Sequence, residues 1–195
     1  IQDWFGAYGN DRGFTIGSDV AVFDWVNIFD TLSMAKVLQP VLISNRKSCH
    51  WEGNYYLQAG KHSFSFSLNS YKGNWKGGYK VGMQKNRPLY AVVKSNQDMK
   101  DGSLPSTYSF GGIRGNDVIV SAVKKCEDDE SVVMRCYDIS GGSQEVEFNF
   151  FKDLNSVQHT NMIEENGKLI SNKKQSFNYP LGKYSIETFK LNIKY

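Results

Sequence analysis

The sequence has few of the residues that build metal centres and disulfide frameworks. It contains three cysteines and three histidines in 195 residues. The cysteines are odd in number and do not follow the paired-thiol spacing of a zinc site. The histidines are scattered along the chain, and the acidic residues come singly or in polar turns. We therefore expect no metal site and no catalytic carboxylate pair built by this chain alone.

The sequence also lacks an excess of one charge and long apolar runs. Its 23 Lys and Arg against 20 Asp and Glu give a formal net charge of +3, too small to indicate a nucleic-acid partner. No run approaches the roughly 20 apolar residues of a membrane-spanning helix, and no basic-then-apolar leader opens the chain. We expect neither nucleic acid nor membrane as a partner. The start at Ile1, directly in structured sequence, indicates a fragment or a processed product.

Aromatic and turn residues are what the sequence has in quantity. There are 12 Phe, 11 Tyr, 4 Trp and 18 Gly but only 4 Pro, a composition that favours half-buried strands. Polar and apolar residues alternate in 63–68 and 145–150, which predicts strands with one buried face. Residues 118–123 and 132–139 are richer in β-branched residues, as in strands covered on both faces.

Turn signals divide the chain into short segments. Pairs such as Gly77-Gly78, Gly141-Gly142 and Asn166-Gly167 tolerate positive φ and separate about ten to twelve predicted strands. The fold class predicted from this spacing is all-β, as an antiparallel β-sandwich. A helix over 28–38 is the weaker alternative for that segment, because Pro40 stops it and β-branched residues flank it.

Two local features of the predicted strands can be specified further. Strands over 117–126 and 131–139 would place Cys126 opposite Ser131 and Cys136 opposite Ser121, with the two sulfurs about 17 Å apart. That distance exceeds disulfide reach, so we expect free thiols, which favour a reducing, cytoplasmic compartment without fixing it. In 184–193 the apolar residues do not all fall on the same alternating positions, and a bulge near Thr188 would bring them onto one face.

A polar segment predicts a domain boundary. Residues 95–103 contain one apolar side chain, and all four tryptophans precede them. We therefore expect two β units with different cores, residues 1–97 and 98–195.

Several segments of the sequence resemble, in order and spacing, parts of one known protein family. Residues 118–138 are similar to the family's "S-A-x-K-x-x-E-D … x-V-x-R-x-Y" hairpin, and 182–191 to its closing strand. Upstream, 1–5, 13–17 and 58–66 look like the trailing strands of its large sandwich. These segments together resemble the C-terminal β region of glycoside hydrolase family 38 α-mannosidases, and the resemblance covers nearly the whole chain. It implies the end of a galactose-mutarotase-like supersandwich followed by a small C-terminal β-sandwich.

The resemblance implies a non-catalytic role for this chain. Family members are retaining, zinc-dependent α-mannosidases whose zinc ligands and catalytic carboxylates lie in an upstream domain. No catalytic residue, metal ligand or cofactor can therefore be carried onto this chain, and we expect it to be inactive alone. The implied partners are the upstream catalytic domain of the same polypeptide, with its zinc, and a mannose-containing glycan.

Four residues are candidates for lining the sugar cleft. Asp11-Arg12 is the nearest match to an Asp-Arg-x-x-Gly-like segment of some relatives, and Arg can donate a fork of hydrogen bonds to vicinal hydroxyls. Trp51 and Tyr55 could stack on a pyranose face. The plainer interpretations are an exposed turn for Asp11-Arg12 and packing for the aromatic rings. A stand-alone carbohydrate-binding β-sandwich module is the alternative function, and a non-enzymatic adhesion sandwich is a third.

Overall fold

The computed structural model describes residues 3–20, 22–27, 36–47, 55–95 and 105–193. The chain divides into two compact units, Ile1–Lys94 and Ser95–Tyr195, here called the N-terminal and C-terminal units. Among the described residues, no helix has the length and apolar character needed to span a membrane.

The N-terminal unit is built on a three-stranded antiparallel sheet. Its order is β1 (Trp4–Tyr8), β2 (Arg12–Ser18) and β7 (Phe66–Lys72). Two short ribbons accompany it, β3 (Phe23–Asn27) with β4 (Lys36–Pro40) and β5 (Arg46–Lys47) with β6 (Tyr55–Tyr56). The helix considered for 28–38 is wrong at its C-terminal end, because residues from Lys36 pair with β3 as a strand. Residues 28–35 lie outside the described part.

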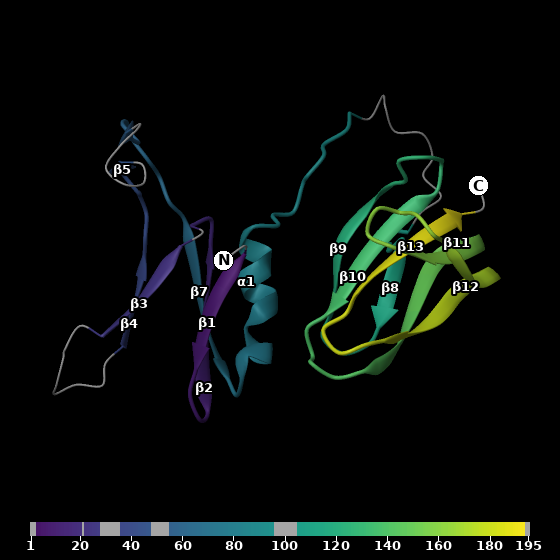
Figure 1. The fold of residues 1–195 in the computed structure, drawn as a ribbon, viewed down its shortest axis with the longest axis horizontal. Coiled ribbons are helices and arrows are strands. Elements are labelled where there is room, and N and C mark those ends of the chain that lie inside the picture. Colours follow the sequence, from purple (N-terminus) through teal and green to yellow (C-terminus); the bar gives the residue numbers. More distant parts are fainter. Residues whose placement is uncertain (1–2, 21, 28–35, 48–54, 96–104, 194–195) are drawn as a thin grey trace. The chain divides into compact units, whose positions relative to one another are not determined.

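A short helix that the sequence did not indicate covers one face of this sheet. The 3-10 turn η2 (Trp75–Gly77) leads into α1 (Tyr79–Lys85), which Figure 1 shows alongside β1 and β7. The approach is close because Gly82 has no side chain: a Cβ there would lie 2.5 Å from Trp4 Cβ and 2.6 Å from Thr15 Cγ2. At the helix end, the Asn86 side-chain amide donates to the carbonyls of Asp3 (3.0 Å) and Ser18 (2.7 Å).

The helix covers the face opposite to the one expected from the alternation in 63–68. Ser67 pairs with Gly17 and shares its face, the one toward α1, because a Cβ at Gly17 would meet both Ser67 and Lys85. Leu68 is 75% exposed and Phe66 43% exposed on the other face. The prediction that the apolar phase is the buried one is therefore wrong for β7. The alternation defines two faces, but the position of α1 decides which face is covered.

The C-terminal unit is a β-sandwich, which confirms the predicted fold class. Its sheet has the order β12-β11-β13-β10-β9, and β8 pairs separately with β11. The strands are β8 (Gly111–Arg114), β9 (Val118–Lys125), β10 (Val132–Asp138), β11 (Gln144–Thr160), β12 (Lys168–Leu181) and β13 (Ile186–Ile193).

The long strand β11 joins the two layers of the sandwich. Its first half pairs with β8 and its second half with β13, with a register shift between Asn149 and Leu154. The sheet thereby folds over itself (Figure 1). The fully buried side chains between the layers include Phe148, Phe189, Val157 and Leu191. Phe148 stacks on Phe177 with ring centroids 4.9 Å apart.

The hairpin of β9 and β10 departs from its predicted register at one position. The Cys126 amide donates to the Ser131 carbonyl (2.8 Å) as expected, but Cys136 pairs with Val120 instead of Ser121. Ser121 is the extra residue of a bulge, and its hydroxyl donates to the Arg135 carbonyl (3.3 Å). Cys126 and Cys136 are buried free thiols, as predicted.

Two further strand predictions are corrected. β10 is covered on both faces, but β9 is an edge strand whose Val123 is 66% exposed. No bulge occurs near Thr188, because Ile186 to Leu191 pair with β10 without interruption. Ile186 lies on the outer face and is 54% exposed, so the change of apolar phase needs no backbone irregularity.

Candidate functional site

Asp11 and Arg12 lie at the turn of the β1–β2 hairpin. The Gly9 amide donates to the Arg12 carbonyl (2.8 Å), which closes the turn. The side chains of Asp11 and Arg12 are 86% and 79% exposed and 3.8 Å apart, so their ion pair contributes little to stability. A shallow hollow of about 240 Å³ adjoins Arg12 and is lined also by Tyr8 and Phe14. This arrangement could offer a guanidinium fork and an aromatic edge to a polyhydroxylated ligand.

The aromatic candidates do not join this hairpin in one sheet. Tyr55 is 66% exposed on β6, where it pairs with Lys47, and its neighbour Tyr56 is 51% exposed. Trp51 lies outside the described residues. The structure thus exposes Asp11, Arg12 and Tyr55 but distributes them over two separate sheets. Their contact with sugar stays a prediction.

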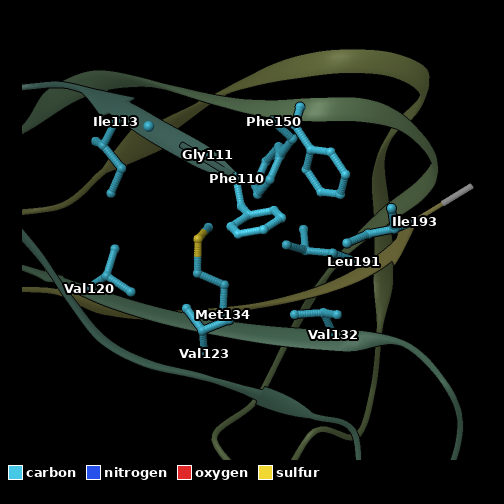
Figure 2. A pocket seen from close by; sticks show the side chains of 12 residues that line it. Phe110, Gly111, Ile113, Val120, Val123, Val132, Met134, Phe150, Leu191 and Ile193 are labelled. Carbon is cyan, nitrogen blue, oxygen red and sulfur yellow. The ribbon is translucent and has the colours of Figure 1, made fainter. Parts of the chain in front are cut away.

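An apolar pocket in the C-terminal unit was missed by the sequence analysis. It has a volume of about 230 Å³ and lies between β8 on one side and β9, β10 and β13 on the other. Figure 2 shows Phe110 and Met134 pointing toward each other inside it, with Ile113 facing Val120. The pocket exists because β9 is an edge strand and β8 is only four residues long, which leaves the sandwich open there. Strand patterns alone do not show where a sandwich stays open.

The lining of this pocket suits the packing of apolar groups. It does not provide the residues that a bond-breaking reaction needs. Its twelve lining residues are apolar side chains or glycines: Phe110, Gly111, Gly112, Ile113, Val120, Val123, Val132, Met134, Phe150, Phe151, Leu191 and Ile193. No acid, base or nucleophile projects into it from these residues. A cavity of this kind accepts one or two large apolar groups.

The most buried carboxylate of the described chain serves turn structure. Asp138 is 2% exposed and accepts hydrogen bonds from the amides of Ser140 (3.1 Å), Gly141 (3.0 Å) and Tyr184 (3.0 Å). It also accepts from the Ser140 hydroxyl (2.5 Å) and the Gln144 side-chain amide (3.0 Å). Burial by itself raises the pKa of Asp138, but these hydrogen bonds outweigh it and lower the pKa to about 2. Such an ionised, fully bonded group holds two turns together.

Other charged groups form pairs on the sandwich. The Lys124 ammonium lies 2.7 Å from Glu164 and also contacts Glu127, and these hydrogen bonds raise the pKa of Lys124 and lower that of Glu164. His159 Nε2 lies 2.6 Å from Glu187 Oε2. Within the described ranges, no three His, Cys, Asp or Glu side chains gather as a metal site would require. These groups stabilise the sandwich and are not arranged as an acid, base and nucleophile set.

Comparison with known proteins finds a family likeness in the C-terminal unit. Residues 117–189 match the model of the glycosyl hydrolases family 38 C-terminal beta sandwich domain. Two solved structures from Enterococcus faecalis, a protein in the glycosyl hydrolase family 38 and an alpha-mannosidase, each match with a TM-score of 0.70 and 15% identity. Both comparisons cover 97% of this chain, but only 22% and 20% of the respective solved chains. Among curated proteins, none matches.

The resemblance found in the sequence is confirmed by these matches. The family model covers the hairpin of β9 and β10 and the first half of β13, which are among the segments that carried the resemblance. The likeness to the solved structures shows a shared fold over nearly the whole chain, and the chain spans about one fifth of their length.

Proposed function

Because residues 117–189 carry the C-terminal β-sandwich domain of glycoside hydrolase family 38, we propose that this chain is the C-terminal, non-catalytic β region of an α-mannosidase. The observation that carries the proposal is this match, which falls on a unit with a hydrophobic core of its own. The hydrolysis of α-mannosidic bonds then belongs to an upstream domain of the same polypeptide. The retaining mechanism and the zinc site belong to that domain as well.

The part of this chain in the enzyme is to support the catalytic domain. Apolar side chains that a stand-alone domain would cover are exposed, including Leu68 at 75% and Leu57 at 73%. The apolar pocket of Figure 2 offers a further site for side chains of a neighbouring domain. Such surfaces suit a region that packs against another domain of its own polypeptide.

Part of the N-terminal unit lines one wall of the sugar cleft in this proposal. The exposed Arg12 fork, with the Tyr8 ring beside the same hollow and Asp11 next to Arg12 in the turn, suits hydrogen bonding to vicinal hydroxyls. Tyr55 offers an exposed ring for stacking on a sugar face.

The proposal is tested by measuring hydrolysis of a chromogenic α-mannoside with zinc present. The chain alone, the separately expressed upstream region of its parent gene, and their mixture are compared. We expect activity that requires the mixture. Activity of the chain alone would refute the assignment of the chemistry to the upstream domain.

The role of Arg12 has a matched control. Arg12→Ala is expected to raise KM for the mannoside with little change in kcat, since Arg12 contacts substrate hydroxyls away from the bond that breaks. Arg114→Ala is the control because its side chain is also 79% exposed and also pairs with one carboxylate, Glu147 at 3.4 Å. If both variants have the same KM and kcat, the proposal that Arg12 lines the cleft is refuted.

A stand-alone carbohydrate-binding module is the second candidate. The exposed ring of Tyr55 favours it, since an exposed aromatic ring can stack on a sugar face. Calorimetric titration of the chain with mannosides decides between the two. Tight binding by the chain, together with inactivity of the mixture, would favour the module over the enzyme region.

A further inference from the structure

A run of five consecutive apolar residues lies shortly after α1, and its side chains are exposed to solvent. Residues 89–93, here called the apolar strap, read Leu-Tyr-Ala-Val-Val. Leu89 is 100% exposed, Tyr90 90%, Val92 80% and Val93 95%. Figure 1 shows the chain after α1 as a plain trace without an arrow. In the described part of the chain, the strap belongs to no sheet and makes no backbone hydrogen bond to another described residue.

The composition of the strap is that of a strand covered on both faces. Successive side chains of a strand point to opposite faces, so Leu89, Ala91 and Val93 would share one face and Tyr90 and Val92 the other. Both faces are apolar, which is the pattern of a strand inside a sheet that is buried on each side. Pro88 precedes it, at the position where a strand tolerates proline.

The start of the strap is fixed to the three-stranded sheet. Asn86 bonds to the carbonyls of Asp3 and Ser18, and the Arg87 guanidinium lies 2.9 Å from the Asp3 carboxylate. The strap therefore leaves the N-terminal unit from a defined point. The strap is anchored at its start, and its five apolar side chains are exposed. Such a segment suits pairing with the strand of a neighbouring sheet.

The N-terminal unit has little core of its own to which the strap could return. Val20 and Tyr79 are the buried apolar side chains among its described residues. The C-terminal unit, by contrast, closes its core around Phe148 with its own strands. The solved structures that share this fold are about five times as long as this chain, so most of their fold lies outside the part that it matches. Because residues 117–189 match a C-terminal domain, the partner of the strap is sought in the polypeptide that the proposed function places upstream of this chain.

We propose that the apolar strap is a β-strand that adds to a sheet of the upstream polypeptide and is buried there on both faces. The main-chain hydrogen bonds give the strand its register, and the alternating side chains fill pockets on the two faces. This inference rests on the proposed function, since it takes the upstream polypeptide as the partner.

The test measures binding and amide hydrogen exchange with the separately expressed upstream region. In the chain alone, the strap amides should exchange at the rate of unstructured peptide. In the complex they should exchange at least about a hundredfold more slowly. Val92→Lys places a charge on a buried face, and Ala91→Pro removes one ladder hydrogen bond. Each is expected to weaken binding at least about tenfold.

The control is Ile163→Lys, an equally drastic change at a 69% exposed apolar residue outside the strap. It should leave binding unchanged. The strap variants should fold normally on their own, because the strap is bare in the isolated chain. Unchanged tryptophan fluorescence of the chain checks this.

The outcomes separate the two proposals. If the unaltered chain does not bind the upstream region, the proposed function fails. If it binds, but the strap amides exchange fast in the complex and both strap variants bind normally, the strap inference alone is overturned. It is also overturned if the strap is protected in the isolated chain, through its own C-terminal unit or, when protection rises with concentration, through a second copy.

Discussion

Removing the Asp138 carboxylate tests how the C-terminal sandwich holds its turns. Asp138→Ala would leave three backbone amides, those of Ser140, Gly141 and Tyr184, without their acceptor. An unsatisfied donor of this kind costs about 1 kcal/mol or more, so we expect a loss of about 3 kcal/mol in the free energy of unfolding. Asp138→Asn keeps the shape and one acceptor oxygen, and about 1–2 kcal/mol should be lost.

The same carboxylate predicts a pH dependence. Its pKa in the folded chain, about 2, lies below the ordinary value of 3.8, so folding favours the ionised form. The stabilisation is therefore fully present above about pH 4 and is lost as the pH falls toward 2. The Asn variant has no carboxyl group at this position, so its stability should fall less over this range.

Urea unfolding followed by far-UV circular dichroism measures these changes. Asp153→Ala is the control, because Asp153 is an exposed carboxylate on β11 and its removal should change stability by no more than about 0.5 kcal/mol. The reasoning is refuted if Asp138→Ala loses less than about 1 kcal/mol, or if the Asn variant and the unaltered chain lose stability equally between pH 4 and pH 2.

Three further predictions concern packing and thiol reactivity. Phe148→Ala, at a fully buried side chain, should cost about 3–5 kcal/mol in urea unfolding, and a loss under 1 kcal/mol would contradict the assigned core. Gly82→Ala should destabilise the N-terminal unit by about 1–3 kcal/mol, because the new Cβ would lie 2.5 Å from Trp4 Cβ. If the urea unfolding transition followed by tryptophan fluorescence does not shift, α1 is not so closely packed against the sheet. Burial, assisted by the charge of Glu187, raises the pKa of Cys136 to about 12. Iodoacetamide at pH 8 should therefore label Cys136 only after the chain is unfolded, as measured by mass spectrometry of the peptide that contains it. Labelling of Cys136 in the native chain would contradict this buried environment.

The C-terminal unit is the part of the fold most accessible to prediction from sequence. Neighbouring residues determine a hairpin, and the polar turn after Cys126 set the pairing of β9 with β10 correctly from Val132 to Arg135. The same hairpin carried the family resemblance, which the match over 117–189 confirms. The bulge at Ser121 was not visible, because an extra residue is accommodated by twist and packing of the sheet and leaves no fixed sequence signal.

In the candidate site, too, some features could be predicted from the sequence and others could not. An exposed turn is the plainer interpretation of Asp11-Arg12 from the sequence, and both side chains are exposed. The apolar pocket could not be predicted, since its lining comes from five strands and a preceding loop that are far apart in the chain. Only the pairing of these strands shows that β8 and β9 leave an opening between the layers.

The sequence by itself determined the strand-rich fold class, the free thiols at Cys126 and Cys136, and the family resemblance of the C-terminal sandwich, because these follow from local periodicity, spacing and motif. The tertiary structure alone decided which face of β7 is covered, where α1 lies, and that the strap remains bare. Alternation assigns residues to two faces, but the covering element determines which of them is buried. That element is brought to the sheet by contacts distant in sequence, such as those of Asn86 with Asp3 and Ser18.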